Sequence, residues 1–224
     1  NSGFIMAISK LNFNSLNVTP AANEAIGFDS GADDLETGAG GGSMAFIKKL
    51  TASSSGTLSF VNGASDVVLN STYKEYVFVC NNMHPSAVAN FSFQGSSDTG
   101  SNYGVAITST HFQAKIDETD ATSQGFQYES GRDLAQGTGF QILTESQNTA
   151  NDEHCSGIIH LFNPASTTFV KHFSTTFQSI SDNPSSSNNY CAGYFNTTSV
   201  IDAIQFKFAS GNIDSGTITL YGII

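Results

Sequence analysis

The 224-residue sequence predicts an all-β protein, an antiparallel β-sandwich of the jelly-roll type that is preceded by an extended N-terminal arm. From residue 46 onward, apolar residues alternate with polar ones in short runs, which indicates strands rather than helices. Clusters of Gly, Ser, Asn and Asp separate these runs, as expected for turns. Only 12% of the residues are charged, while 18 Phe and 7 Tyr supply core-forming side chains, which argues against a helical bundle and against disorder throughout.

The chain is predicted to have three parts. Residues 1–37 form an arm, residues 38–44 a Gly-rich linker, and residues 45–224 the sandwich domain. The linker is expected to be flexible because glycine has no preferred backbone conformation. The arm has too few apolar residues for a core of its own. We expect it to dock on a neighbouring subunit, with a disordered tail as the alternative. The predicted docking residues are Leu11, Phe13, Leu16 and Val18.

The first strands of the domain are predicted from alternate residues that share one face. These residues are Leu58 and Phe60, then Tyr76, Phe78 and Cys80, and then Phe91 and Phe93. In the segment 104–116 the apolar residues change phase, from Val105 and Ile107 to Phe112, Ala114 and Ile116. This change predicts a β-bulge around residues 109–111.

The later strands follow the same reasoning. Residues 155–162 are almost continuously apolar, which predicts a central strand. Three more strands are predicted from residues on one face: Phe169, Phe173 and Phe177; Ile204, Phe206 and Phe208; and Ile218 with Leu220. About ten short strands without a convincing long helix lead to the sandwich prediction.

The charge and the cysteines exclude several classes of function. The formal net charge is −11, and the eight basic residues are scattered, so a nucleic-acid footprint is not expected. No apolar run reaches the roughly 18 residues of a membrane span. Cys80, Cys155 and Cys191 are predicted to be small core residues, with a Cys155–Cys191 disulfide as the alternative.

The candidates for catalysis and metal binding are weak. No G-x-S-x-G nucleophile motif is present. Asp152 and His154 would share one face at a strand start, which is a minimal metal pattern, and the acidic segment 117–120 offers oxygen ligands for calcium. Glu129 and Glu145 are a conceivable glycosidase pair. Each pattern is more simply explained as an ordinary loop or turn, so we expect a non-enzymatic protein with no cofactor and no metal.

Histidines and tyrosines supply the candidate binding residues. His160 and His172 become cross-strand neighbours if their strands pair antiparallel, in the core or at an interface. Four tyrosines are expected to be exposed near loops, where they would stack on sugars or contribute to a subunit interface. They are Tyr103, Tyr128, Tyr190 and Tyr194.

Several segments resemble virion structural proteins of marine tailed phages, cyanophages especially. They are residues 9–20 (SKLNFNSLNVTP), 44–55 (MAFIKKLTASSS), 57–60 (TLSF), 157–164 (GIIHLFNP) and 216–223 (GTITLYGI). The resemblance extends over most of the chain and implies a component of a phage particle. It carries no functional motif that would assign roles to single residues.

The sequence therefore leads to two hypotheses. The first is a non-enzymatic phage virion structural protein, a capsid decoration or a tail or fibre appendage, that self-assembles through its sandwich and its arm. It would be a homo-oligomer, for example a trimer, located in the virion and in contact with other virion proteins. The alternative is a carbohydrate-binding module that recognises host-surface glycans. Neither hypothesis involves nucleic acid or a membrane.

Overall fold

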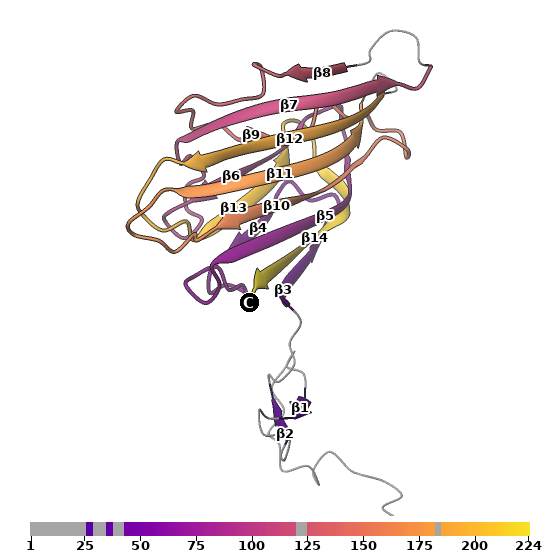
Figure 1. Ribbon diagram of the computed structural model, residues 1–224. Helices are drawn as coiled ribbons and strands as arrows, with labels where there is room; N and C mark the ends of the chain where they lie inside the picture. Colours follow the sequence, from indigo (N-terminus) through magenta and orange to yellow (C-terminus); the bar gives the residue numbers. More distant parts are fainter. Residues whose placement is uncertain (1–25, 29–34, 38–42, 120–124, 182–184) are drawn as a thin grey trace, which may run out of the picture. The chain divides into compact units, whose positions relative to one another are not determined.

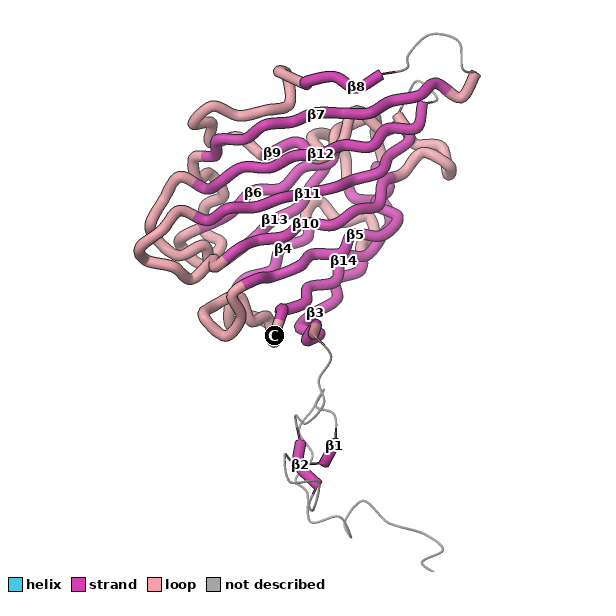
Figure 2. Tube along the Cα trace, in the orientation of Figure 1, coloured by secondary structure: helices cyan, strands magenta, loops and turns pink. Residues whose placement is uncertain are grey.

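The computed structural model describes residues 26–28, 35–37, 43–119, 125–181 and 185–224, as strands and the loops that connect them (Figures 1 and 2). The chain divides into two compact units, Asn1–Ala45 and Phe46–Ile224. In the first unit, β1 (Ile26–Phe28) pairs antiparallel with β2 (Leu35–Thr37). The described part of the chain contains no helix that is long and apolar enough to cross a membrane. The predicted docking residues Leu11, Phe13, Leu16 and Val18, and most of the predicted linker, lie outside the described residues.

The second unit consists of two antiparallel sheets. In order across the large sheet lie β3 (Met44–Thr51), β14 (Ile213–Ile223), β5 (Glu75–Pro85), β10 (Cys155–Phe162), β11 (Lys171–Ile180), β12 (Ser185–Phe195), β7 (Ile107–Asp117) and β8 (Gly125–Tyr128). In order across the small sheet lie β4 (Leu58–Val61), β13 (Ala203–Phe208), β6 (Phe91–Ser96) and β9 (Gln141–Ile142). The two sheets pack as layers, which confirms the predicted antiparallel β-sandwich (Figure 1). The jelly-roll subtype stays a prediction.

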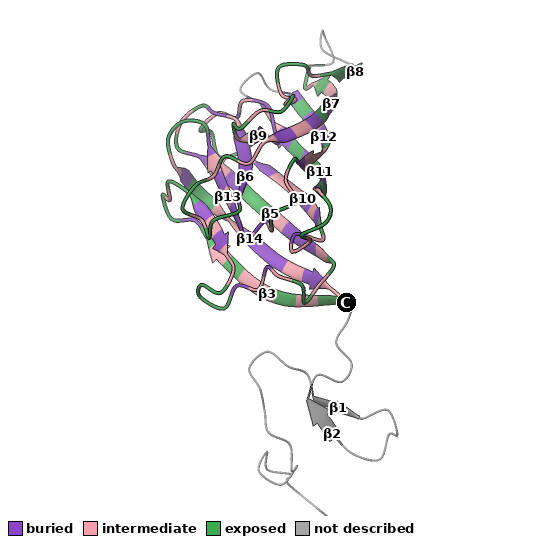
Figure 3. Cartoon of the chain, turned by 90° about the vertical axis from the view of Figure 1, so that its left-hand side faces the viewer, coloured by how far each residue is buried: buried purple, intermediate pink, exposed green. Residues whose placement is uncertain are grey.

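Phenylalanine rings fill much of the space between the layers. Phe206 of the small sheet has its ring centroid 5.5 Å from that of Phe78 and 6.0 Å from that of Phe91. Along the strands, buried positions alternate with more exposed ones, as the colours of Figure 3 show. The predicted inward residues of β4, β5, β6, β13 and β14 are all buried, and β10 lies between β5 and β11 as the predicted central strand. Period-two alternation therefore identified these strands correctly.

Two expectations about strands are wrong. Strand β7 pairs with β12 in continuous register from Ile107 to Asp117, so residues 109–111 form no bulge. The apolar residues change face instead: Ile107 points inward and Phe112 outward on a regular strand. Phe169 does not continue the face of Phe173, because it lies in the loop before β11, where it is 69% exposed.

Candidate interaction surface

The space beneath β7 and β12 is polar, in contrast to the phenylalanine core. The buried inward positions are Ser109, His111 and Gln113 on β7, and Ser185, Ser187 and Asn189 on β12. Ser109 and Ser187 interact with the segment 129–147, which includes buried Gln141 and Glu145. Ser109 Oγ donates a hydrogen bond to Gln141 Oε1 at 2.6 Å, and Ser187 Oγ donates one to Glu145 Oε1 at 2.8 Å. Such bonds offset the cost of burying polar groups in this part of the sandwich.

Glu145 is the centre of this buried network. Its carboxylate lies 3.0 Å from Lys115 Nζ and 3.1 Å from Arg132 Nη2. Burial by itself would raise the pKa of this carboxyl, but hydrogen bonds, above all from Ser187 and Lys115, outweigh burial and lower the pKa to about 2. Burial, together with the nearby Arg132 charge, lowers the pKa of His111. The network therefore holds the segment 129–147 against β7 and β12 with an ionised Glu145.

The opposite face of β7 carries aromatic and aliphatic side chains. Four rings form what we call the aromatic patch: Phe112 on β7, Phe126 and Tyr128 on β8, and Tyr190 on β12. The Phe112 ring centroid is 5.0 Å from that of Phe126 and 5.1 Å from that of Tyr190. Phe126 is 69% exposed, and Ile116 at the end of β7 is 48% exposed. Along residues 109–116, β7 is therefore polar toward the protein interior and largely apolar toward solvent, the reverse of an ordinary sandwich strand.

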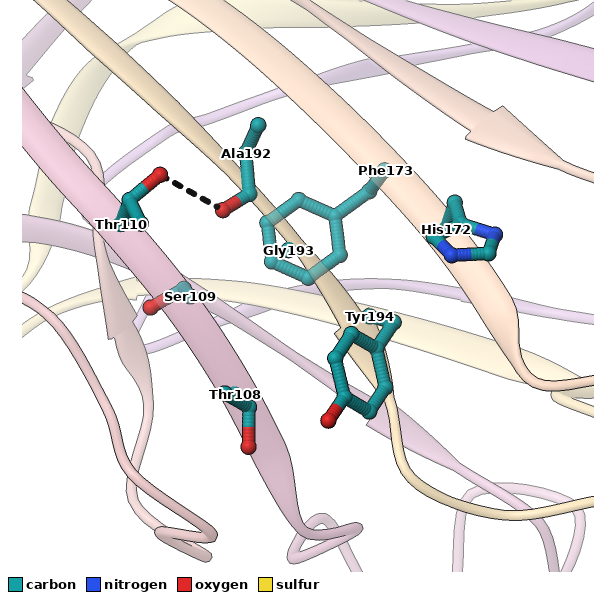
Figure 4. A pocket seen from close by; sticks show the side chains of 8 residues that line it. All are labelled: Thr108, Ser109, Thr110, His172, Phe173, Ala192, Gly193 and Tyr194. Carbon is teal, nitrogen blue, oxygen red and sulfur yellow. Dashed lines mark hydrogen bonds between the residues drawn. The ribbon is translucent and has the colours of Figure 1, made fainter.

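A hollow opens on the same face where β7, β12 and β11 lie side by side (Figure 4). Its volume is about 340 Å³, and mostly apolar atoms line it. The lining residues are Thr108, Ser109, Thr110, His172, Phe173, Ala192, Gly193 and Tyr194. Gly193 lies at its centre: an added Cβ would be 2.5 Å from the Thr108 backbone oxygen and 2.9 Å from Phe173 Cζ. The rings of Tyr194 and His172 stand beside it with centroids 6.0 Å apart. This Gly193 hollow suits an apolar group.

The outer face, defined as the outward positions of β7, β8, β10, β11 and β12, is nearly uncharged. On β7, β10, β11 and β12 these described positions contain no Asp, Glu, Lys or Arg. Their ionisable side chains other than tyrosine are His160 and His172. The sequence as a whole carries a net charge of −11. The acidic residues of the protein therefore lie outside these positions.

The structure brings three of the four predicted tyrosines to this face. Tyr128, Tyr190 and Tyr194 lie on strands β8 and β12 rather than in loops. Tyr103 lies apart, in the loop between β6 and β7, with its hydroxyl 2.9 Å from the position that a Cβ at Gly100 would take. The three tyrosines on this face fit either predicted role, an interface or a sugar platform.

The two histidines are on the same face but are not cross-strand neighbours. Strands β10 and β11 do pair antiparallel, but His160 is opposite Ser174. His172 is opposite Tyr194 of β12 on the other side of its strand. His160 Nδ1 is within hydrogen-bonding distance of the Glu75 carboxylate of β5. The expectation that His160 and His172 are cross-strand neighbours is therefore wrong, because His172 lies two residues away from Ser174, the residue opposite His160.

The predicted acidic groupings have structural roles. Glu129 and Glu145 both approach Arg132, at 3.9 Å and 3.1 Å. Glu145 is only 7% exposed and has a lowered pKa, whereas a glycosidase general acid needs a raised one. In the segment 117–120, Asp117 accepts hydrogen bonds from the backbone nitrogen and the hydroxyl of Thr119, while residue 120 lies outside the described residues.

The structure also shows where the candidate metal ligands and the cysteines lie. His154 lines a polar pocket at the start of β10, and Asp152 is not among the residues that line it. Within the described ranges, no three His, Cys, Asp or Glu side chains come together as a metal site would require. Cys80, Cys155 and Cys191 are buried and free, which confirms their prediction as core residues and leaves no Cys155–Cys191 disulfide.

The sequence pattern does not mark Phe112, Phe126 or Gly193 as surface residues. The phase change within residues 104–116 is the signal for Phe112, because it also fits a strand whose apolar residues switch from one face to the other. The signal for Gly193 needs the strand pairing, because its hollow combines residues from three strands. Comparison with protein-family models, curated proteins and solved structures found no match.

Proposed function

We propose that this protein is a non-enzymatic structural subunit that self-associates through the outer face of its large sheet. The observation that carries the proposal is the reversed polarity of β7. Its inward side chains, such as His111 and Gln113, are polar and buried, while Phe112 and Ile116 point outward. Together with Phe126, they expose an apolar surface that a partner would cover.

A second copy of the same chain is the partner that this surface fits. Two copies with a net charge of −11 repel each other over most of their surfaces, but the outer face lacks carboxylates on β7, β10, β11 and β12. The outer face has five strands, four of which are 8 to 11 residues long. It therefore covers about 24 Å by about 30 Å, or roughly 700 Å². Stable interfaces bury about 800 Å² per partner, so the face is close to the size of a specific contact.

The strength of one contact follows from the exposed side chains. Five large side chains of the outer face are between 38% and 69% exposed: Ile116, Phe126, Tyr128, Ile158 and Phe162. Covering each would contribute about 1 kcal/mol, or about 10 kcal/mol for the two copies. Association costs about 4–15 kcal/mol, so a single contact is weak. A closed oligomer or a repeated array, in which each subunit makes more than one contact, is therefore the expected assembly.

The sequence offers a matched pair of variants for the test. Phe126 on the outer face and Phe169 in the loop before β11 are both 69% exposed. We expect Phe126→Asp to weaken self-association at least tenfold, about 1.4 kcal/mol, in sedimentation equilibrium, and Phe169→Asp to leave it unchanged. Equal masses for both variants and the unmodified chain, or equal loss in both variants, would contradict the proposed surface.

The resemblance to phage virion proteins suggests the setting of this assembly, a tailed-phage particle in which the subunit contacts other virion proteins. Docking of Leu11, Phe13, Leu16 and Val18 on a neighbouring subunit remains part of the proposal. A chain truncated to begin at Met44 tests it separately. Loss of the oligomer on truncation would support arm docking, and an unchanged mass would leave the sheet face as the sole proposed contact.

A further inference from the structure

A polar pocket lies away from the Gly193 hollow, where β5, β14 and the loop before β10 meet. Its volume is about 250 Å³. The lining residues are Asn82 and His84 of β5, Asn151 and His154 of the loop, and Asp214 and Ser215 of β14. The pocket is slightly smaller than the roughly 300–1,000 Å³ of pockets for drug-sized ligands. It therefore suits a ligand of about one ring.

The backbone around this pocket departs from regular pairing on three adjacent strands. The register between β14 and β5 shifts on both sides of Ser215, and the register between β10 and β5 shifts between Cys155 and Gly157. Asn82 has a φ of 51°, and its backbone nitrogen donates a hydrogen bond to Ser156 Oγ at 3.0 Å. Bulges and left-handed residues within strands re-aim side chains and cluster at functional sites.

His84 is fixed by two contacts. Its Nε2 donates to the backbone oxygen of Ala150 at 3.1 Å, and its Nδ1 lies 3.4 Å from Asp214 Oδ2. Because Nε2 is engaged by the backbone, Nδ1 is the ring nitrogen that faces the Asp214 carboxylate. Among the described residues, no three His, Cys, Asp or Glu side chains come together, whereas a typical zinc site uses three protein ligands.

The remaining ligand classes are distinguished by charge and polarity. The lining contains no Lys or Arg and includes the Asp214 carboxylate, so an anion is disfavoured. All six lining side chains are polar, so an apolar ligand would leave hydrogen-bonding groups unpaired. Asn82 and Asn151 offer both donors and acceptors, and the Asp214 side chain is 52% exposed. This set matches the adjacent hydroxyl groups of a neutral polyol.

We propose that this pocket binds a neutral polyhydroxyl ligand, a single sugar ring, through the Asp214 carboxylate, the Asn82 and Asn151 amides and the His154 ring. The proposal is independent of self-association, because the pocket shares no residue with the aromatic patch or the Gly193 hollow. It also assigns sugar binding to residues other than the tyrosines.

The test is a titration of the full chain with the methyl glycosides of glucose, mannose and galactose. Binding is monitored by saturation-transfer NMR. We expect at least one glycoside to bind with a dissociation constant on the order of 1–10 mM. Asp214→Asn should weaken this binding about tenfold, and His154→Ala several-fold. Asp66→Asn, which changes a 94% exposed carboxylate elsewhere, should leave the affinity unchanged.

The results separate this site from the alternatives. Binding of none of the three glycosides, or equal binding by Asp214→Asn and the unmodified chain, would overturn the proposal. Binding of zinc chloride at the Asp214 and His154 resonances, with no glycoside binding there, would identify a metal site instead and overturn it as well. Titration of the Phe126→Asp variant, which is expected to bind normally, distinguishes failure of this site from failure of the self-association proposal.

Discussion

Replacement of the buried Glu145 by glutamine tests the polar interior. The pKa of its carboxyl falls from an ordinary 4.5 to about 2 in the folded protein, where Ser187, Lys115 and Arg132 surround it. That difference corresponds to about 3 kcal/mol of folding free energy. Because the folded-state pKa is lowered, this stabilisation is fully present above pH 4.5 and is lost as the pH falls through about 2. Glu145→Gln should therefore lower the free energy of unfolding by about 3 kcal/mol at pH 7.

The assay is urea unfolding of both proteins at pH 7 and pH 3, at concentrations where their masses are equal. Protonated glutamate and glutamine have similar shapes, so the difference between the two proteins should shrink to about 1.5 kcal/mol at pH 3. Other acidic residues titrate in both proteins and cancel in the comparison. A difference below 1 kcal/mol at pH 7, or one that does not change with pH, would refute the ionised network.

Three further outcomes follow from the core and the thiols. Phe206→Ala removes a ring packed against four other phenylalanine rings and should lower the free energy of unfolding by about 3–5 kcal/mol in urea denaturation. Gly193→Ala would bring its Cβ within 2.5 Å of the Thr108 backbone oxygen, and should cost about 1–3 kcal/mol, seen as a lower Tm; an unchanged Tm would contradict this. Burial raises the pKa of Cys155 and Cys191 to about 12, so a thiol reagent should modify neither in the native protein and both in urea.

The sequence allowed the strands with an apolar inner face to be predicted well. Tyr76, Phe78 and Cys80 alternate with less buried residues, and the phenylalanine core favours this register because a shift by one residue would expose all three. Phe169 and Phe173 are four residues apart, as two residues on one face of a strand can be. Strand β11 begins only at Lys171, however, so Phe169 lies before it.

The candidate surface could be predicted only in part. Tyrosines on β12 were expected to be exposed, but the phase change along β7 was attributed to a bulge. A sequence pattern shows that two faces differ, and it does not show which face is inside. Which face is inside depends on what packs against the strand. Here it is the polar segment around Arg132 and Glu145, which follows β7 and β8 in the chain. The Gly193 hollow likewise depends on the pairing of three strands.

The most direct test of the proposed function is the solution mass of the full chain, measured by light scattering over a range of concentrations up to about 1 mM, where even a contact of about −4 kcal/mol is half formed. Self-association through the outer face predicts a mass that rises above 23.6 kDa as the concentration increases, to a discrete multiple for a closed oligomer and without a limit for an array. A mass of 23.6 kDa at every concentration would contradict it.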